Sequence, residues 1–383
     1  MDIGDDVYLH LVQEGKHYLI DLPSRNLMKG LLLAGGHGTR LRPLTFTGNK
    51  HMIPIANKPM LFYGLNHLVD AGIKELAIIL GPVKEGVKEV LHDGSDFGID
   101  ITYIEQPEPK GLAHAVMIAQ DFLGDEPFIM YLGDNLIKQG VKPLIYTHVN
   151  ESSDCVICVA HVKDPTQYGI VELTEEGNIE RLLEKPKTST STLALTGVYL
   201  FNKSIFDAVK NIHPSWRNEL EITDAIQYLV QQGKKISVQR IDGWWKDTGR
   251  PQDLLEANQL VLDSIESALD GDIDSTSRII GRVQIGSNST IGPQTTIKGP
   301  CIIGHNCHIA RGVYIGPYTS IGNGTRVLSG EIEGSIIMED SIINCNKRIV
   351  DSIIGRTSRL ESADNLKPSG LHFVTGDNTF CMI

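Results

Sequence analysis

A glycine-rich segment near the start of the chain has the composition of a phosphate-binding loop. The apolar run 31–34 reads LLLA, the glycine cluster 35–38 reads GGHG, and two cations, Arg40 and Lys50, follow. Glycine lets the backbone turn tightly and approach a ligand closely, and successive N–H groups in such a turn form an anion-binding nest. The segment matches neither GxGxxG nor GxxxxGK[ST], which disfavours a Rossmann dehydrogenase or a P-loop NTPase. The residues therefore predict a phosphate-binding loop that follows a buried strand.

Two aspartates further along the chain have the character of cation ligands. Asp134 stands in LGDN directly after the apolar run 128–132, and Asp247 stands in WKDTG. Taken alone, Asp134 is more simply explained as a turn-forming residue. Two carboxylates together with substrate phosphate oxygens, however, suit the octahedral coordination of Mg²⁺. The pair indicates a magnesium site.

Alternating strands and helices are expected between residues 28 and 250 to position these groups. Strands are predicted at 31–34, 76–80, 101–104 and 128–132, and helices at 60–71, 85–91 and 112–122. This order predicts an α/β fold with a mostly parallel, Rossmann-like sheet and helices on both faces. Ligands bind such sheets at the carboxyl ends of the strands. The glycine cluster and Asp134 both lie at such ends.

Composition excludes several classes of function. The net charge is −12 without a basic block, which argues against a nucleic-acid partner. Six cysteines in 383 residues do not make a disulfide framework. Cys155 and Cys158 lie in one apolar run, where a strand would point them to opposite faces, so structural thiols are expected. Because there is no long apolar segment and no signal-peptide pattern, we expect a cytoplasmic protein without a membrane partner.

The C-terminal third is a repeat. Aliphatic residues recur every six positions from Ile279 to Val327, glycine follows most of them, and small or β-branched residues precede them by two positions. A hexapeptide repeat of this kind is typical of a parallel β-helix. The predicted organisation is an N-terminal extension (1–27, with a hairpin from 7–12 and 18–22), an α/β domain (28–250), a linking helix (251–270), a β-helix (271–360) and a tail (361–383).

The motifs together resemble a known family. Residues 35–45 read G-G-x-G-T-R-L-x-P-x-T, and residues 54–59 read P-x-x-x-K-P, which resembles the signature of the sugar-nucleotide pyrophosphorylases. The strings GLAHAV, MYLGDN, PSWRNELEITDAIQ and WWKDTG are most similar to the long form of glucose-1-phosphate thymidylyltransferases. The resemblance covers residues 28–330 and implies a left-handed β-helix after the nucleotidyltransferase sheet. His51 and His114 depart from the short-form members, which commonly carry Gln at both positions.

The resemblance also implies roles for individual residues. The catalytic group comprises Arg40, Lys50, Asp134, Lys185 and Asp247, of which Asp134 and Asp247 hold Mg²⁺. The nucleotide-binding group comprises Leu33, Ala34, Gly35, Gly36, Gly38, Thr39, Arg40, Lys50, Gln106, Gly111 and Asp134. The sugar-phosphate group comprises Asn135, Gly169, Glu184, Lys185, Val198, Tyr199, Arg217 and Trp245.

These parts suggest one reaction, in which a sugar 1-phosphate attacks the α-phosphorus of a nucleoside triphosphate and pyrophosphate leaves. The expected substrates are dTTP and glucose 1-phosphate. The alternative is a UTP-dependent uridylyltransferase or another sugar-1-phosphate nucleotidyltransferase, because a glutamine amide at Gln106 accepts uracil as well as thymine.

The repeat has two further interpretations. His305 and His308 lie within it, and some hexapeptide-repeat proteins are acyltransferases with a catalytic histidine. No long loop interrupts the regular run to build an acceptor site, so a structural coil is favoured. Its flat sides and exposed ends favour self-association, as a trimer or a higher homo-oligomer.

Overall fold

A computed structural model of the chain describes residues 8–13, 16–21, 28–84 and 86–362. They form two compact units. The sheet unit contains the described residues up to 37, together with 48–52 and 60–247. The β-helix unit contains residues 38–47, 53–59 and 248–362. The glycine-rich segment is therefore divided between the two units, and the domain boundaries expected from the sequence stay a prediction.

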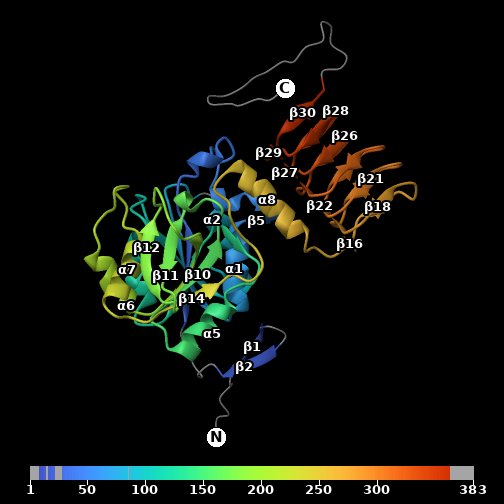
Figure 1. Cartoon of the computed structure of the whole chain (residues 1–383). Coiled ribbons are helices and arrows are strands. Elements are labelled where there is room, and N and C mark those ends of the chain that lie inside the picture. The colour runs from blue at the N-terminus through green and yellow to red at the C-terminus, as the bar shows by residue number, and fades with distance from the viewer. Residues whose placement is uncertain (1–7, 14–15, 22–27, 85, 363–383) are drawn as a thin grey trace. The chain divides into compact units, whose positions relative to one another are not determined.

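A nine-stranded sheet forms the centre of the sheet unit (Figure 1). Its order is β12-β11-β13-β8-β3-β6-β7, and β10 pairs with both β13 and β14. Strands β13 and β12 run against the other seven, since β13 is antiparallel to β8, β10 and β11, and β12 is antiparallel to β11. The mostly parallel sheet is thus confirmed. The strands are β3 (Lys29–Ala34), β6 (Glu75–Leu80), β7 (Asp100–Glu105), β8 (Phe128–Leu132), β10 (Cys155–His161), β11 (Gly169–Leu173), β12 (Ile179–Glu184), β13 (Leu193–Phe201) and β14 (Ile236–Arg240).

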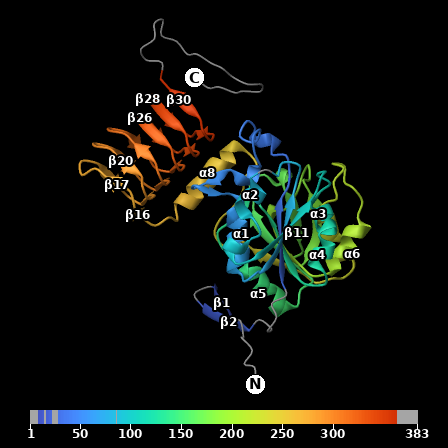
Figure 2. The ribbon, with the colours of Figure 1, turned by 180° about the vertical axis from the view of Figure 1, so that it is seen from behind.

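Two hydrophobic cores cover the two faces of this sheet. Figure 2 shows α1 and α2 on one side of the sheet and α3, α4 and α6 on the other. Leu65 of α1 and Leu144 of α5 belong to one core, and Val116 of α3 and Ile226 of α7 belong to the other. The helices are α1 (Leu61–Asp70), α2 (Val87–Leu91), α3 (Leu112–Ile118), α4 (Gln120–Leu123), α5 (Lys142–Glu151), α6 (Ser204–Asn211) and α7 (Ile222–Gln231), with 3-10 turns at Lys50–Met52, Ser95–Phe97 and Pro165–Gln167.

The predicted elements match this unit closely. Helix α1 ends where Gly72 adopts a φ of 88°, a left-handed conformation that glycine reaches without strain. The helix expected at 85–91 is observed from Val87, and residue 85 lies outside the described residues. The single helix expected at 112–122 is wrong, because Ala119 (φ −89°, ψ −1°) separates α3 from α4.

Smaller elements complete the sheet unit. Strands β1 (Tyr8–Gln13) and β2 (Lys16–Asp21) form the expected antiparallel hairpin, and positions 7 and 22 lie outside the described residues. Strand β9 (Asn135–Ile137) pairs antiparallel with β15 (Trp245–Asp247). Cys155 and Cys158 are buried in β10 and belong to opposite cores, as the strand period predicts. Burial raises the pKa of both thiols.

The β-helix unit begins with α8 (Pro251–Leu262) and continues in short parallel strands. Thr290 pairs with His308 and Ile285 with Ile303, so one coil takes 18 residues, or three hexapeptides. The parallel β-helix is therefore confirmed, and its handedness stays a prediction. The repeated aliphatic residues from Ile285 onward are buried in the coil interior. The strands are β16 (Ala268–Leu269), β17 (Asp272–Ile273), β18 (Arg278–Ile280), β19 (Val283–Ile285), β20 (Thr290–Ile291), β21 (Thr296–Lys298), β22 (Cys301–Ile303), β23 (His308–Ile309), β24 (Tyr314–Ile315), β25 (Thr319–Ile321), β26 (Arg326–Glu333), β27 (Ile336–Ile337), β28 (Ile342–Val350), β29 (Ile353–Ile354) and β30 (Arg359–Glu361).

Both ends of the repeat differ from the sequence expectation in detail. The helix expected to reach residue 269 ends at Leu262, because Ala268 and Leu269 pair with β19 and form the first strand of the coil. Beyond residue 330 the repeat loosens, as predicted. There β26 and β28 are long strands, and the spacing between Arg326 and its partner Ile342 shortens to 16 residues. Most of the tail, 363–383, lies outside the described residues.

A buried polar cluster inside the β-helix unit involves α8, the coil and the short segment 53–59, which contains the paired strands β4 (Pro54–Ile55) and β5 (Lys58–Pro59). Asn258 of α8 is 1% exposed, and its Oδ1 accepts from the Ala56 N–H at 2.8 Å and from Ser320 Oγ at 2.7 Å. The Asn57 amide donates to the Ile321 carbonyl at 2.7 Å. The PxxxKP motif at 54–59 therefore folds against the coil.

Candidate active site

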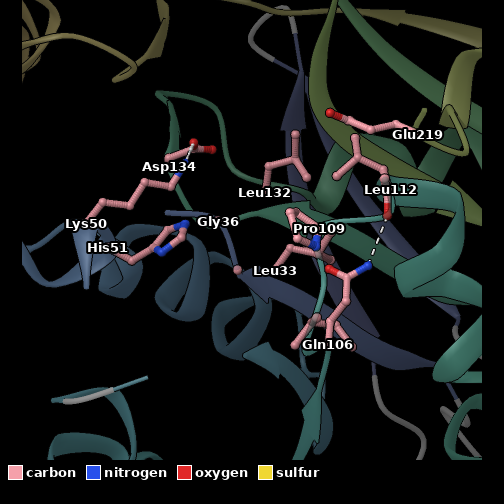
Figure 3. A pocket seen from close by; sticks show the side chains of 13 residues that line it. Leu33, Gly36, Lys50, His51, Gln106, Pro109, Leu112, Leu132, Asp134 and Glu219 are labelled. Carbon is pink, nitrogen blue, oxygen red and sulfur yellow. Dashed lines mark hydrogen bonds and ion pairs between the residues drawn. The ribbon is translucent and has the colours of Figure 1, made fainter. Parts of the chain in front are cut away.

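A pocket lies at the carboxyl ends of β3, β6, β7 and β8, where the sequence placed the site. Figure 3 shows Lys50 and Asp134 at one end of this pocket and Gln106, Pro109 and Leu112 at the other. The lining residues are Leu33, Gly35, Gly36, Lys50, His51, Ile79, Gln106, Pro109, Gly111, Leu112, Leu132, Asp134 and Glu219. One end thus carries the ion pair, and the other is mostly apolar, with the Gln106 amide and the Glu219 carboxylate.

The glycine loop after β3 packs directly against the loop after β6. A methyl group added to Gly81 would lie 2.8 Å from the Gly36 nitrogen and 3.1 Å from the Gly35 Cα, so only glycine fits there. Gly36 has a φ of 100°, a conformation that a side chain would strain. Ala34 is buried at the end of β3, behind these glycines. The backbone of residues 35 and 36 therefore forms the pocket wall itself, as expected for a loop that holds phosphates.

Lys50 and Asp134 form an ion pair at the charged end. Burial opposes ionisation of the Asp134 carboxyl, but the Lys50 ammonium holds its pKa below the ordinary value. Asn135 Nδ2 donates to the other carboxylate oxygen, Asp134 Oδ1, at 3.1 Å. The carboxylate is therefore charged at neutral pH and held from both sides.

His51, next to Lys50, is a pocket residue that the sequence analysis noted without assigning it a role. Its side chain is 1% exposed, and its Nδ1 lies 2.7 Å from Asn49 Oδ1. The Asn49 amide in turn donates to the carbonyls of Ala34 and Val83 at 3.1 and 2.6 Å. Burial and the neighbouring Lys50 lower the pKa of His51 to about 3, so the imidazole is neutral.

The apolar end of the pocket is fixed by a loop between β7 and α3. Gly111 has a φ of 101°, and a methyl group added there would lie 2.3 Å from the Leu220 carbonyl oxygen. The Leu220 N–H donates to the Lys110 carbonyl at 2.8 Å, and the Ala113 N–H donates to the Leu220 carbonyl at 3.1 Å. These contacts bring Glu219 to the pocket rim opposite Gln106.

Arg217 and three glutamates form a second charged cluster. The Arg217 guanidinium lies 2.8 Å from Glu219 and 3.3 Å from both Glu184 and Glu221. Burial and the charge of Glu221 raise the pKa of Glu184. Lys185 adds a second cation, 3.8 Å from Glu184. Two predicted phosphate-binding cations are therefore held by carboxylates in this structure.

Lys185 and Gly169 meet at the open end of the β11–β12 hairpin. Gly169 pairs with Glu184, and a methyl group added to Gly169 would lie 2.7 Å from the Thr223 side chain. Lys185 has a φ of 41°, which a non-glycine residue adopts at a cost of about 1–3 kcal/mol. Its N–H donates to the Tyr168 carbonyl at 3.0 Å. Strained residues of this kind cluster at ligand sites.

Asp134 lies in the turn before β9, and Asp247 ends the neighbouring strand β15. Asp247 of β15 pairs with Asn135 of β9, the residue after Asp134. Trp245 Nε1 donates to Asn135 Oδ1 at 2.7 Å, and the Trp245 ring meets Tyr168 edge-on with 5.3 Å between ring centres. One carboxylate directly before β9 and one at the end of its partner β15 fit a divalent cation that completes its coordination with phosphate oxygens.

Several predicted residues lie elsewhere. The side chains of Val198 and Tyr199 in β13 are 0% and 2% exposed and pack in the two cores, so their contact with a sugar stays a prediction. Gly38, Thr39 and Arg40 belong to the β-helix unit, where a methyl group on Gly249 would lie 2.9 Å from the Arg40 guanidinium. The role assigned to Arg40 is likewise a prediction.

The pocket also contains residues that the sequence analysis did not assign. Glu219 reaches it through the backbone contacts of Leu220, which no local pattern reveals. The apolar wall is composed of Ile79, Pro109, Leu112 and Leu132. Apart from Pro109, these residues have types that are ordinary in strands and helices. Only their positions near the ends of those elements distinguish them from other core residues.

The chain resembles proteins of known class over nearly its whole length. The family profile described as nucleotidyl transferase matches residues 29–264, and the one described as GMPPB C-terminal domain matches residues 297–379. The chain is 44% identical to the low-salt glycan biosynthesis nucleotidyltransferase of Haloferax volcanii, with 92% of this chain and 99% of that protein covered. It is 45% identical to the glucose-1-phosphate thymidylyltransferase of Streptomyces antibioticus, with 92% and 98% covered.

A solved structure extends this likeness to the fold. The crystal structure of a UDP-glucose pyrophosphorylase complexed with UDP-glucose superimposes with a TM-score of 0.57 at 26% sequence identity. It covers 62% of this chain and 99% of that one.

Proposed function

Because the chain belongs to the nucleotidyl transferase family and acts as a sugar-1-phosphate nucleotidyltransferase, we propose that it transfers dTMP from dTTP to glucose 1-phosphate. The products are dTDP-glucose and pyrophosphate. The observation that carries the proposal is the pocket with the Lys50–Asp134 ion pair at one end and the Gln106 amide at the other. The similarity to the glucose-1-phosphate thymidylyltransferase of Streptomyces antibioticus supports the choice of substrates.

In this proposal, an oxygen of the sugar phosphate attacks the α-phosphorus of the nucleotide. A P–O bond forms there, and the bond from the α-phosphorus to the bridging oxygen of pyrophosphate breaks. The nucleophile is already anionic, because a phosphate monoester has a second pKa of about 6, so no general base is required. Catalysis then depends on positioning and on neutralisation of charge.

The residues of the pocket divide these tasks. The Gly35 and Gly36 backbone holds the triphosphate, and Lys50 neutralises charge near the reacting phosphorus. Arg40 holds the leaving pyrophosphate, as the family resemblance implies. Gln106 contacts the base at the apolar end.

Lys185 and Arg217 bind the sugar phosphate in this proposal. Because Arg217 is held by three carboxylates, the phosphate has to displace at least one of them. Glu219 makes the shortest of the three contacts and also lines the pocket. We expect the arriving phosphate to replace Glu219 on the guanidinium.

The divalent cation used by the family is proposed to be Mg²⁺, held by Asp134 and Asp247. When bound, it would supply charge neutralisation on the phosphate oxygens. Asp134 is already charged and oriented by Lys50 and Asn135, so this ligand needs no reorganisation of its protonation state.

Uridylyl transfer is the second candidate. The Gln106 amide meets the edge of the base that uracil and thymine share, and the UDP-glucose complex of the structural neighbour favours a uridine nucleotide. A missing methyl group is worth only about 1–3 kcal/mol of discrimination, so both triphosphates are expected to react.

One assay tests the proposal. Pyrophosphate release is measured with Mg²⁺ present for dTTP, UTP, ATP and GTP, each against glucose, galactose, mannose and N-acetylglucosamine 1-phosphates. Release should be fastest with dTTP and glucose 1-phosphate. Release with UTP alone would favour uridylyl transfer, and no release with any pair would refute the proposal.

The surroundings of the enzyme are also proposed. The described cysteines are free, which is typical of a reducing compartment, so we infer a cytoplasmic protein. Among the described residues, no helix has the length and apolar character to cross a membrane. We propose a trimer or higher homo-oligomer formed through the coil, which light scattering after gel filtration would test.

A further inference from the structure

The side chain of Gln106 is held at its nitrogen by two neighbours. Gln106 follows β7 and is 8% exposed. Its Nε2 lies 3.2 Å from the Gly111 carbonyl oxygen and 2.9 Å from Nδ1 of His114 in α3. Figure 3 shows the Gln106 amide oxygen pointing away from the hydrogen bond that the amide nitrogen makes. The amide is therefore oriented before any base arrives.

The chemistry of the two neighbours determines which atom of the amide meets the base. A carbonyl oxygen can only accept, so it must face the amide nitrogen rather than the amide oxygen. The nitrogen carries two hydrogens, and the second one points to His114. His114 Nδ1 must then be the acceptor, with the ring proton on Nε2. Both amide hydrogens are consumed inside the protein, and the oxygen is the atom available to a ligand.

We propose that His114 is a positioning residue that makes Gln106 a pure hydrogen-bond acceptor toward the base. This inference rests on the proposed function and deepens it. A nucleobase is then selected for a ring N–H at the position facing Gln106. Thymine and uracil carry such a group at N3, whereas cytosine presents a bare N3 lone pair there. The pairing selects keto pyrimidines and disfavours cytosine.

His114 is needed because Gly111 alone leaves the second amide hydrogen without an acceptor. Without an acceptor for that spare N–H, the amide could rotate and offer a donor to the N3 atom of cytosine. The imidazole removes this alternative by accepting the hydrogen. It touches Gln106 rather than the base, so its effect should be on selection between bases more than on the chemical step.

The test compares variants of the full chain. His114→Leu and His114→Phe remove the acceptor, and His114→Gln restores one through its side-chain oxygen. His148→Leu is the matched control, because His148 is also half-buried in the sheet unit and its Nδ1 lies 2.8 Å from the Ser153 carbonyl. The measured quantity is the ratio of kcat/KM for dTTP to kcat/KM for dCTP, with glucose 1-phosphate as acceptor.

We expect His114→Leu and His114→Phe to lower this ratio about tenfold, mainly through KM, which corresponds to the loss of one hydrogen-bond constraint. His114→Gln should recover most of the ratio, and His148→Leu should leave it unchanged. An unchanged ratio in both apolar variants, or a His114→Gln variant that behaves as they do, would overturn the inference.

Equilibrium binding separates this inference from the proposed function. The affinities of dTDP and dCDP are measured by calorimetry without sugar phosphate. If the wild-type chain released no pyrophosphate with any substrate pair, the proposed function would fail. A dTDP preference that His114→Leu abolishes would still support the role of His114, and equal preference in the two proteins would exclude it.

Discussion

The sheet unit and the coil use buried polar groups in opposite ways. In the coil, Ser289 Oγ donates to the Gly304 carbonyl at 2.7 Å, and Thr295 Oγ1 donates to the Ala310 carbonyl at 3.0 Å. These hydroxyls are 0% exposed and bond to the neighbouring turn of the repeat. Around the pocket of the sheet unit, Lys50, Asp134 and Gln106 also bond to neighbouring protein groups, but they line the pocket as well.

The buried polar groups of the coil thus stabilise the fold, whereas those of the sheet unit are placed to contact a ligand. A buried hydroxyl that is satisfied by the adjacent coil stabilises the fold and leaves nothing for a ligand. A charged or amide side chain that lines a pocket can also contact a substrate there. The comparison predicts that substitutions in the two regions will affect different measurements.

The largest expected effect is on the reaction. Lys50→Met removes the cation beside Asp134, and kcat/KM for nucleotidyl transfer should fall roughly 10²–10³-fold, as when other electrostatic stabilisers are removed. The measurement is pyrophosphate release at saturating Mg²⁺. His308→Ala is the control, because His308 is exposed on the coil with Nδ1 2.8 Å from Thr290 Oγ1. An equal loss of kcat/KM in both variants would contradict the assignment of catalysis to the sheet unit alone.

A smaller effect is expected on stability in the coil. Asn258→Ala removes the acceptor of the Ala56 N–H and the donor to the Tyr318 carbonyl, which lies 3.1 Å from Nδ2. Leaving buried groups unpaired should lower the free energy of unfolding by about 1–3 kcal/mol. Denaturant unfolding followed by circular dichroism measures this change. A variant with wild-type stability would show that water replaces the asparagine.

The pH dependence of stability tests the sheet unit. The unfolded chain takes up a proton at His51 as the pH falls below about 6.5, whereas folded His51, with a pKa of about 3, stays neutral. Protons therefore favour the unfolded state, and His51 should lower the free energy of unfolding by about 1 kcal/mol between pH 6.5 and 5.5, and by about 1.4 kcal/mol per pH unit below that. Urea unfolding at pH 6.5 and 5.5 would reveal it. His51→Gln should flatten the slope, and an unaltered slope would count against a neutral, buried imidazole.

The smallest effect is expected from removing one methyl group from the core of the coil. Ile303 is 1% exposed in β22, and Ile303→Val should lower the free energy of unfolding by about 0.5–1.5 kcal/mol. kcat/KM should remain at the wild-type value, since the lost methyl group lies in the coil core. A changed kcat/KM with an unchanged free energy of unfolding would contradict the proposal that the coil contributes to stability and not to catalysis.

The sequence predicted the fold where a regular period governed it. The six-residue spacing alone indicated the β-helix, and the strand ends at Gly35 and Asp134 indicated the pocket. The sequence did not indicate the early end of α8, because Ala268 and Leu269 pair with β19 instead of continuing the helix. It did not indicate the break at Ala119 either, because alanine favours a helix and no local breaker stands there.

The site was predictable only in part. Asp134 and Gln106 are polar residues that follow strands, and Lys50 follows the glycine loop, so their places at the pocket could be predicted. The engagement of Arg217 by three carboxylates was not, because Glu184 lies 33 residues away and meets it only through the sheet. The link between His114 and Gln106 spans eight residues across a loop and a helix start, and the sequence offered only an unusual histidine there.

The signature region around residues 35–59 is divided between the two units, and this limits how the chain can be cut into separate domains. Ala56 and Asn57, from within the signature, bond to α8 and to the coil, whereas Lys50 belongs with the sheet. A cut at residue 250 would therefore not yield two interchangeable modules, because the first fragment would carry a stretch whose hydrogen-bond partners were left behind.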